Sequence, residues 1–215
     1  RQVDDLFFYI IIFGLLGARL GHVFFFEWSY YMAHPIDIIK IWNGGISIQG
    51  ALLGGIVTII LWARHNKINF WKLIDVLVPA VALGQFIGRW GNYFNQELYG
   101  TPTDKWWGIP IAEIYRVEGY QYFSHFQPAF FFESVLNLVL FLVLHFALKI
   151  SKLKAGIITL SYFIGYSIIR FFMEFVRIDE TFILWDWRLP QLISLLLIII
   201  SLFTILYIYK YKKRS

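Results

Sequence analysis

Six long apolar stretches constrain the fold of this chain more than any other feature. They cover approximately residues 6–28, 44–64, 71–94, 128–149, 155–177 and 190–209. Each approaches the ~20 residues that an α-helix needs to cross the hydrocarbon core of a bilayer. Only 15% of the 215 residues are charged and 59% are hydrophobic, which is typical of proteins that have lipid as their solvent. We therefore expect an all-α polytopic membrane protein, with about six transmembrane helices in a single transmembrane domain over 1–215.

Basic residues gather between and after these stretches in a pattern that predicts the orientation. The clusters are Arg64, Lys67 and Lys72; Lys149, Lys152 and Lys154; and Lys210, Lys212, Lys213 and Arg214. The positive-inside rule places all three clusters in the cytoplasm, so the C-terminus is expected there. Residues 29–43, 95–127 and 178–189 should then face outward. The longest of these, 95–127, is expected to form a small external head segment.

The composition also excludes several classes of function. The chain has no cysteine, so it has neither disulfides nor thiolate ligands of its own. No histidine pair has metal-ligand spacing, and we expect no metal and no cofactor. The net charge of +5 comes from residues at helix ends, so nucleic acid is not an expected partner. Because the chain starts with Arg1 rather than Met, we expect that upstream sequence is missing.

Ionisable residues inside the apolar stretches are the first candidates for a functional site, because charge is costly in lipid. The arginines are Arg19, Arg89, Arg170 and Arg177, and the acids available to them are Glu97, Glu133 and Glu174. The spacing of Arg170, Glu174 and Arg177 predicts one helix face that carries all three. One interpretation is that the charges form ion pairs that lock helices together. The excess of arginine favours a cavity for an anion such as a phosphate headgroup, which the planar guanidinium suits.

Two further stretches leave alternatives open. The segment W-N-G-G-I-S-I-Q-G-A-L-L-G-G at 42–55 carries five glycines, which permit either close packing of helices or backbone contact with a ligand. The segment Q-P-A-F-F-F-E-S at 127–134 places Glu133 one turn into an apolar stretch. Glu133 either pairs with an arginine or takes a direct chemical role.

Several blocks of the sequence resemble one family. The segment G-R-W-G-N-Y-F-N-Q-E-L-Y-G at 88–100 is similar to the signature of the bacterial prolipoprotein diacylglyceryl transferases. Five more blocks match that family in order, namely 17–20, 42–55, 127–134, 165–179 and 188–194. The resemblance implies an enzyme of the bacterial cytoplasmic membrane, with seven transmembrane helices in the full-length family and its active site toward the outer face.

The resemblance also implies an activity and a set of site residues. Family members transfer the diacylglyceryl group of phosphatidylglycerol to the lipobox cysteine thiol of a prolipoprotein, forming a thioether and releasing glycerol 1-phosphate. The implied partners are phosphatidylglycerol, prolipoprotein signal peptides and the lipid bilayer. The implied catalytic residues are Arg89, Arg170, Tyr166 and Glu97. The candidate contacts to phosphatidylglycerol are Arg89, Asn92, Gly100, Gln49, Asn95, Glu174, Arg177 and Glu133.

The chain departs from the family pattern in three places. The family's N-terminal helix with an R-W-Y-G-type segment is not found in this sequence. Gln49 stands where many members have histidine. A block often written H-P-x-x-x-Y-E has Gln127 and Phe132 in place of its histidine and tyrosine. Since Gln49 cannot accept a proton at neutral pH, either Glu133 or Glu97 acts as the base, or nearby arginines ionise the thiol. The alternative functions are an anion or lipid transporter and a non-catalytic phospholipid-binding paralogue.

Overall fold

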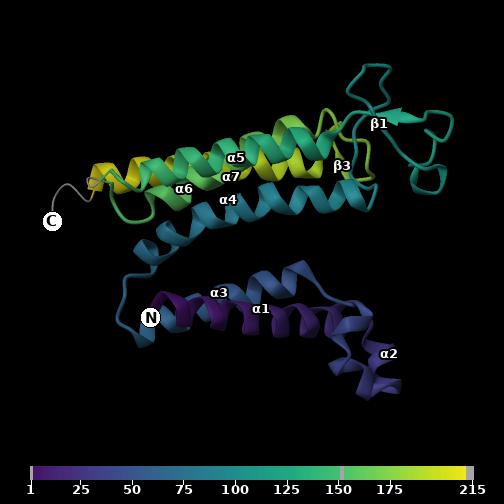
Figure 1. The fold of residues 1–215 in the computed structure, drawn as a ribbon. Helices are drawn as coiled ribbons and strands as arrows, with labels where there is room; N and C mark the ends of the chain where they lie inside the picture. The colour runs from purple at the N-terminus through teal and green to yellow at the C-terminus, as the bar shows by residue number, and fades with distance from the viewer. Residues whose placement is uncertain (1, 151–152, 212–215) are drawn as a thin grey trace. The chain divides into compact units, whose positions relative to one another are not determined.

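The computed structural model describes residues 2–150 and 153–211, which are largely helical (Figure 1). Its α-helices are α1 (Gln2–Phe25), α2 (Trp28–Ala33), α3 (Ile48–His65), α4 (Phe70–Phe94), α5 (Ala129–Ala147), α6 (Ile157–Met173) and α7 (Leu189–Tyr211). Short 3₁₀ helices are η1 (Pro35–Ile39), η2 (Ile41–Asn43) and η3 (Glu113–Tyr115). Two antiparallel pairs join β1 (Ile109–Pro110) to β2 (His125–Phe126) and β3 (Ile183–Leu184) to β4 (Trp187–Arg188). The chain divides into two compact units, unit 1 up to Leu73 and unit 2 from Ile74.

All six predicted spans are confirmed as helices of an all-helical, multi-pass membrane protein. Within the described residues, α1, α3, α4, α5 and α7 are long and apolar enough to cross a membrane, and α6 is a shorter apolar helix of 17 residues. Lys152, Lys212, Lys213 and Arg214, which contribute to the predicted orientation, lie outside the described residues. The orientation, the single transmembrane domain and the external position of 95–127 stay predictions.

In unit 1, α1 and α3 pack together through glycines that stand four residues apart on each helix. A Cβ atom on Gly50 would lie 2.1 Å from the carbonyl oxygen of Gly17, and one on Gly17 would lie 2.4 Å from that of Gly50. Gly54 meets the carbonyl oxygen of Phe13 in the same way, at 2.3 Å. For these glycines the sequence left helix packing and ligand contact open, and the structure accounts for them by helix packing.

In unit 2, α4, α5, α6 and α7 run side by side, with β1 and β3 at one end and the end of α7 at the other (Figure 1). Their shared core contains Val78, Ala82, Ala129, Leu140, Leu144, Ile158, Tyr162, Ile169 and Met173. Ser134 of α5 donates a hydrogen bond to the carbonyl oxygen of Phe86 in α4, at 3.0 Å. These contacts fix the helix ends that carry the arginines.

The other end of this bundle contains a buried carboxylate that caps a helix. Asp75 of α4 accepts hydrogen bonds from the backbone amides of Gly156 and Thr159, at 2.6 and 2.8 Å, and from the Thr159 hydroxyl, at 2.7 Å. The first amides of a helix have no partner within it, and they favour negative charge. Asp75 therefore joins α4 to the start of α6.

The segment 95–127 has a small core of its own. Tyr99, Ile111 and Phe126 are buried together, and the strands β1 and β2 pair beside them. The Tyr99 hydroxyl donates to the carbonyl oxygen of Tyr115 and accepts from the amide of Val117, at 2.8 and 2.7 Å. These contacts give the segment a defined structure, as a head segment requires.

One local prediction is wrong. Arg177 was expected on the same face of a helix as Arg170 and Glu174, but α6 ends at Met173. The backbone leaves the helix because Arg177 pairs with Gly100 in an isolated antiparallel bridge, and the amide of Thr101 donates to the carbonyl oxygen of Val176 at 2.9 Å. Arg177 thus belongs to the segment after α6 rather than to its face.

The glycine contact predicts a selective effect of added methyl groups. Gly50→Ala should lower the thermal stability of the protein in detergent by the equivalent of ~1–3 kcal/mol, because its Cβ meets backbone that cannot rotate away. Gly55→Ala is the matched control, since a Cβ there meets nothing within 4 Å. Equal unfolding temperatures for the two variants would contradict this account of the helix contact.

The Asp75 cap predicts a graded loss of stability. Asp75→Ala leaves three buried donors unpaired and should cost about 2–4 kcal/mol, whereas Asp75→Asn keeps an acceptor oxygen and should cost less. Thermal unfolding in detergent measures both variants. Asp104→Ala, at an exposed site, is expected to change stability by no more than ~0.5 kcal/mol. An Asp75→Ala protein as stable as the Asp104→Ala control would refute the assigned role.

Candidate functional site

A cluster of paired charges occupies the end of unit 2 that lies near β3. It contains Arg89, Glu133, Arg170, Glu174, Arg177, Asp179 and Arg188, and we call it the arginine cluster. Its members come from α4, α5, the last turn of α6, the segment that follows α6, and β4. Elements distant in sequence therefore meet at one place through their charges.

Glu133 connects the first two arginines. Its Oε1 atom lies 2.5 Å from Nη2 of Arg89, and its Oε2 atom lies 3.6 Å from Nη1 of Arg177. The Glu133 side chain is only 2% exposed. Of the two alternatives left open by the sequence, the structure shows the ion pair.

Glu174 connects the other two arginines. Its Oε1 atom lies 2.6 Å from Nη2 of Arg170 and its Oε2 atom lies 2.7 Å from Nε of Arg188, although the angles there are not those of hydrogen bonds. The i, i+4 pairing of Arg170 with Glu174 confirms the predicted contact on α6. The Nη1 atom of Arg170 is buried and has no hydrogen-bond partner among the described residues. A buried donor without an acceptor is a candidate contact for a ligand.

Asp179 closes the cluster outside the helices. Its Oδ1 atom accepts a hydrogen bond from Nε of Arg177 at 2.7 Å, and its Oδ2 atom lies 3.8 Å from Nη2 of Arg188. Burial alone would raise the pKa of Asp179, but the hydrogen bond from Arg177 and the charges of Arg177, Arg188 and Arg170 lower it overall. Asp179 thus stays ionised at neutral pH.

An amide network extends the cluster from Arg89 to Glu97. Nη1 of Arg89 donates to the side-chain oxygen of Asn92 at 3.3 Å, and the Asn92 amide donates to Glu97 at 2.9 Å. Asn95 also donates to Glu97, at 3.2 Å. Four residues of the 88–100 block are therefore in contact, with the exposed Glu97 holding the two asparagines in place.

Gly100 and Tyr166 also lie next to members of the cluster. A Cβ on Gly100 would meet the Val176 side chain at 2.8 Å, so only glycine lets residues 100–101 pair with 176–177. Gly100 thereby fixes the backbone that carries Arg177. Tyr166 precedes Arg170 by one helical turn, and its ring stacks on Tyr162 with centroids 5.8 Å apart.

Arg19 has a different environment, in unit 1. Its five N–H groups donate to the backbone carbonyls of Asp37, Ile38, Lys40, Gly44 and Gly45. Its guanidinium also lies 4.9 Å from the centre of the Tyr31 ring. Arg19 is 5% exposed and closes the loop between α2 and α3. Backbone carbonyls, not an acid, thus satisfy this arginine.

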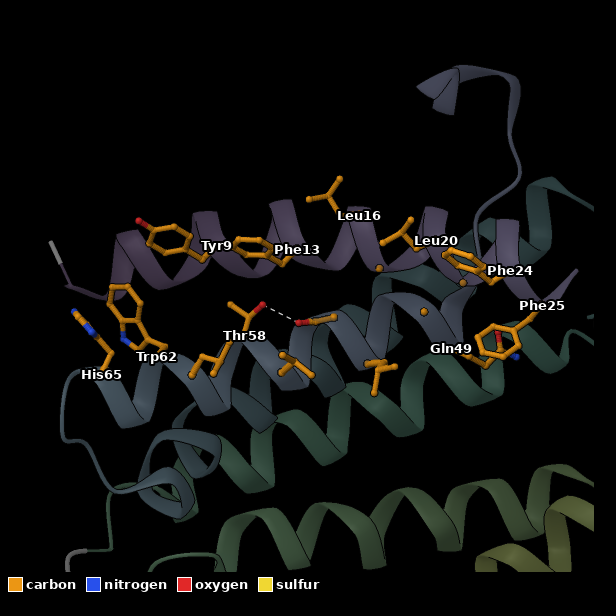
Figure 2. Close-up of a pocket in the computed structure, with 17 residues that line it drawn as sticks. Tyr9, Phe13, Leu16, Leu20, Phe24, Phe25, Gln49, Thr58, Trp62 and His65 are labelled. Carbon is orange, nitrogen blue, oxygen red and sulfur yellow. Dashed lines mark hydrogen bonds between the residues drawn. The ribbon is translucent and has the colours of Figure 1, made fainter. Parts of the chain in front are cut away.

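Gln49 also lies in unit 1, at one end of an apolar groove along α1 and α3 (Figure 2). The groove has a volume of about 950 Å³, and His65 and Trp62 lie at its other end. The Gln49 side-chain oxygen accepts a hydrogen bond from the Ser47 hydroxyl at 2.8 Å. All residues that line the groove belong to unit 1, whereas the arginine cluster belongs to unit 2.

Sequence reasoning missed two members of the cluster, Arg188 and Asp179. Both were placed in an outward-facing segment, and a charge outside an apolar stretch has no need of a buried partner. The available signal was the position of Arg188, directly before an apolar stretch and inside a block that resembles the family. Among the described residues, no group of three or more histidines and acids could hold a metal ion.

Comparisons with known proteins place the chain in a family. A model of that family, prolipoprotein diacylglyceryl transferase, matches residues 1–207. The phosphatidylglycerol–prolipoprotein diacylglyceryl transferase of Synechococcus elongatus is 41% identical over 99% of this chain and 75% of its own length. The enzymes of that name from Synechocystis and Listeria innocua are each 40% identical, over 98% and 95% of this chain and 75% and 74% of their own lengths. The chain belongs to the prolipoprotein diacylglyceryl transferase family.

Proposed function

We propose that this chain transfers the diacylglyceryl group of phosphatidylglycerol to the cysteine thiol of a prolipoprotein, and that the arginine cluster binds the lipid phosphate. Family membership and the names of the relatives support the reaction. The buried Nη1 atom of Arg170, which lacks a partner among the described residues, supports the site. A phosphate oxygen would supply the missing acceptor.

The reaction creates negative charge on the phosphate. A bond from sulfur to the glyceryl carbon forms while the bond from that carbon to the phosphate oxygen breaks, and the proton of the thiol passes to solvent water. The phosphodiester carries one negative charge, and the departing glycerol 1-phosphate carries up to two. Fixed positive groups that face this oxygen lower the barrier, because they stabilise charge that develops in the transition state.

We assign separate roles to the residues that surround the phosphate. Arg170 donates through its free Nη1, while Arg89, held by Glu133 and Asn92, presents a second guanidinium. Glu97 keeps Asn92 in position to orient the glycerol headgroup. Tyr166, one turn from Arg170, lies beside the bound lipid in this proposal.

The cluster also bears on how the cysteine loses its proton. Both carboxylate oxygens of Glu133 are paired with arginines, and the Oε1 atom of Glu97 accepts hydrogen bonds from Asn92 and Asn95, so both acids already serve to hold other side chains. Positive charge beside a thiol lowers its pKa, and the arginines supply that charge where the thiol would meet the phosphate. We therefore propose that the thiolate forms through the field of the cluster. A transporter is less well supported, because the paired charges gather at one end of the bundle.

We propose that the protein acts in the bacterial cytoplasmic membrane, with the arginine cluster toward the outer face. The basic residues Lys149, Lys154 and Lys210 belong to the opposite end of the unit 2 bundle, which supports this orientation under the positive-inside rule. A lipobox cysteine in a signal peptide would then meet the lipid headgroup at the outer surface.

The proposed roles predict a contrast between Arg170 and Gln49. Arg170→Ala should reduce transfer by about 10²–10³-fold or more, because it removes a donor aimed at the developing charge. Gln49→Ala should reduce it less than about tenfold, because Gln49 is not assigned as a base. Membranes that contain each variant are incubated with phosphatidylglycerol and a lipobox peptide, and the thioether product is measured by mass spectrometry.

The matched control is Arg64→Ala, which removes an exposed arginine at the end of α3 and should leave the rate unchanged. If Gln49→Ala is as inactive as Arg170→Ala, the thiolate does not form through the arginine field alone.

A further inference from the structure

Arg188 is held rigidly by the elements around it. It ends β4, directly before α7 begins at Leu189. The turn between β3 and β4 consists of Trp185 and Asp186, both with positive φ (52° and 65°), as in the two-residue turns that match the twist of a hairpin. The amide of Leu189 donates to the carbonyl oxygen of Phe182 at 2.8 Å and closes this hairpin. The backbone position of Arg188 is therefore fixed, and this limits where its guanidinium can lie.

Protein atoms already occupy the donors of Arg188. Nη1 donates to the carbonyl oxygens of Arg177 and Glu174, at 2.6 and 3.3 Å, and Nη2 donates to that of Asp179 at 2.5 Å. Nε lies 2.7 Å from the Glu174 carboxylate, and the side chain is 18% exposed. Because Nη1 and Nη2 donate to backbone carbonyls and Nε is ion-paired with Glu174 without a hydrogen-bond angle, the guanidinium of Arg188 is directed mainly at the protein. Any effect of Arg188 on lipid binding must therefore act through Glu174 and Asp179, the two acids with which it forms ion pairs.

Those acids are the ones that would otherwise neutralise the phosphate-binding arginines. Glu174 is shared by Arg170 and Arg188, and Asp179 is shared by Arg177 and Arg188. The directly ion-paired residues of the cluster are four arginines and three carboxylates, which leaves one positive charge in excess; Glu97 is exposed and connects to Arg89 only through Asn92. Without Arg188, three arginines would face three carboxylates and no excess would remain.

We propose that Arg188 is a positioning and specificity residue of the site. Arg188 forms ion pairs with Glu174 and Asp179. It thereby leaves Arg170 able to bind a phosphodiester and gives the cluster one excess positive charge. That charge matches the single negative charge of a phosphatidylglycerol headgroup and disfavours a zwitterionic one. The inference rests on the function proposed above. The lowered pKa of Asp179, to which Arg188 contributes after Arg177, is in accord with it.

A set of variants separates this role from a merely structural one. Arg188→Gln should raise the KM for phosphatidylglycerol at least about tenfold, as expected when an interaction with a charged group is lost, with a smaller change in kcat. Arg188→Lys keeps the charge and should be less impaired. The double variant Arg188→Gln/Glu174→Gln removes one charge of each sign, and its KM should recover toward the wild-type value.

The matched control is Arg116→Gln. Arg116 donates to the backbone carbonyls of Ile111 and Gln121 in the 95–127 segment, so this variant also removes an arginine that supports backbone. It should lower stability without changing the KM. If Arg188→Lys and the double variant are both as impaired as Arg188→Gln, then Arg188 only supports the backbone and the inference is wrong.

A binding experiment distinguishes failure of the inference from failure of the proposed function. The full chain is placed in phosphatidylcholine nanodiscs that contain either phosphatidylglycerol or phosphatidylethanolamine, and the retained lipid is measured after dilution into detergent. Wild type should retain phosphatidylglycerol preferentially, and Arg188→Gln should lose that preference. A preference that persists in Arg188→Gln overturns the inference. A preference lost in that variant, together with no transfer by wild type, supports the inference and refutes the function.

Discussion

The carboxylate of Glu133 is the contact on which the geometry of unit 2 depends. It comes from α5 and holds an arginine of α4 on one side and Arg177 of the segment after α6 on the other. Burying a charged carboxylate is costly unless it is paired, so this arrangement persists only while both arginines stay in place. Three parts of the chain are therefore fixed relative to each other by one side chain. The free donor of Arg170 lies in the same cluster, next to the second acid, Glu174.

Much of the fold could be predicted from the sequence because few backbone structures can satisfy their hydrogen bonds within a lipid bilayer. Apolar stretches of about 20 residues must be helices, and all six of them are. The pair Arg170–Glu174 followed from helical spacing alone. The end of α6 could not be predicted in this way, because the chain leaves the helix to pair residues 176–177 with 100–101, far away in sequence.

The candidate site was only partly predictable, for a related reason. Hydropathy identifies charges inside apolar stretches, and so it found Arg89, Glu133 and Arg170. It gives no signal for a charge in a connecting segment that the fold later buries, and so it missed Arg188 and Asp179. The same logic assigned Arg19 to a possible site, because periodicity cannot distinguish an arginine that faces a ligand from one that faces backbone carbonyls.

The setting of Arg19 has a consequence for how unit 1 responds to its surroundings. A guanidinium does not lose its proton at any pH at which proteins function, and carbonyl oxygens do not titrate. The contacts of Arg19 with the loop between α2 and α3 therefore do not depend on the protonation of an acid or base, in contrast to the ion pair of Asp37 with Lys40 in the same loop. Dissolved ions also weaken these contacts little, since their acceptors are neutral dipoles and the group is buried. The contacts of Arg19 thus persist over a range of pH and ionic strength.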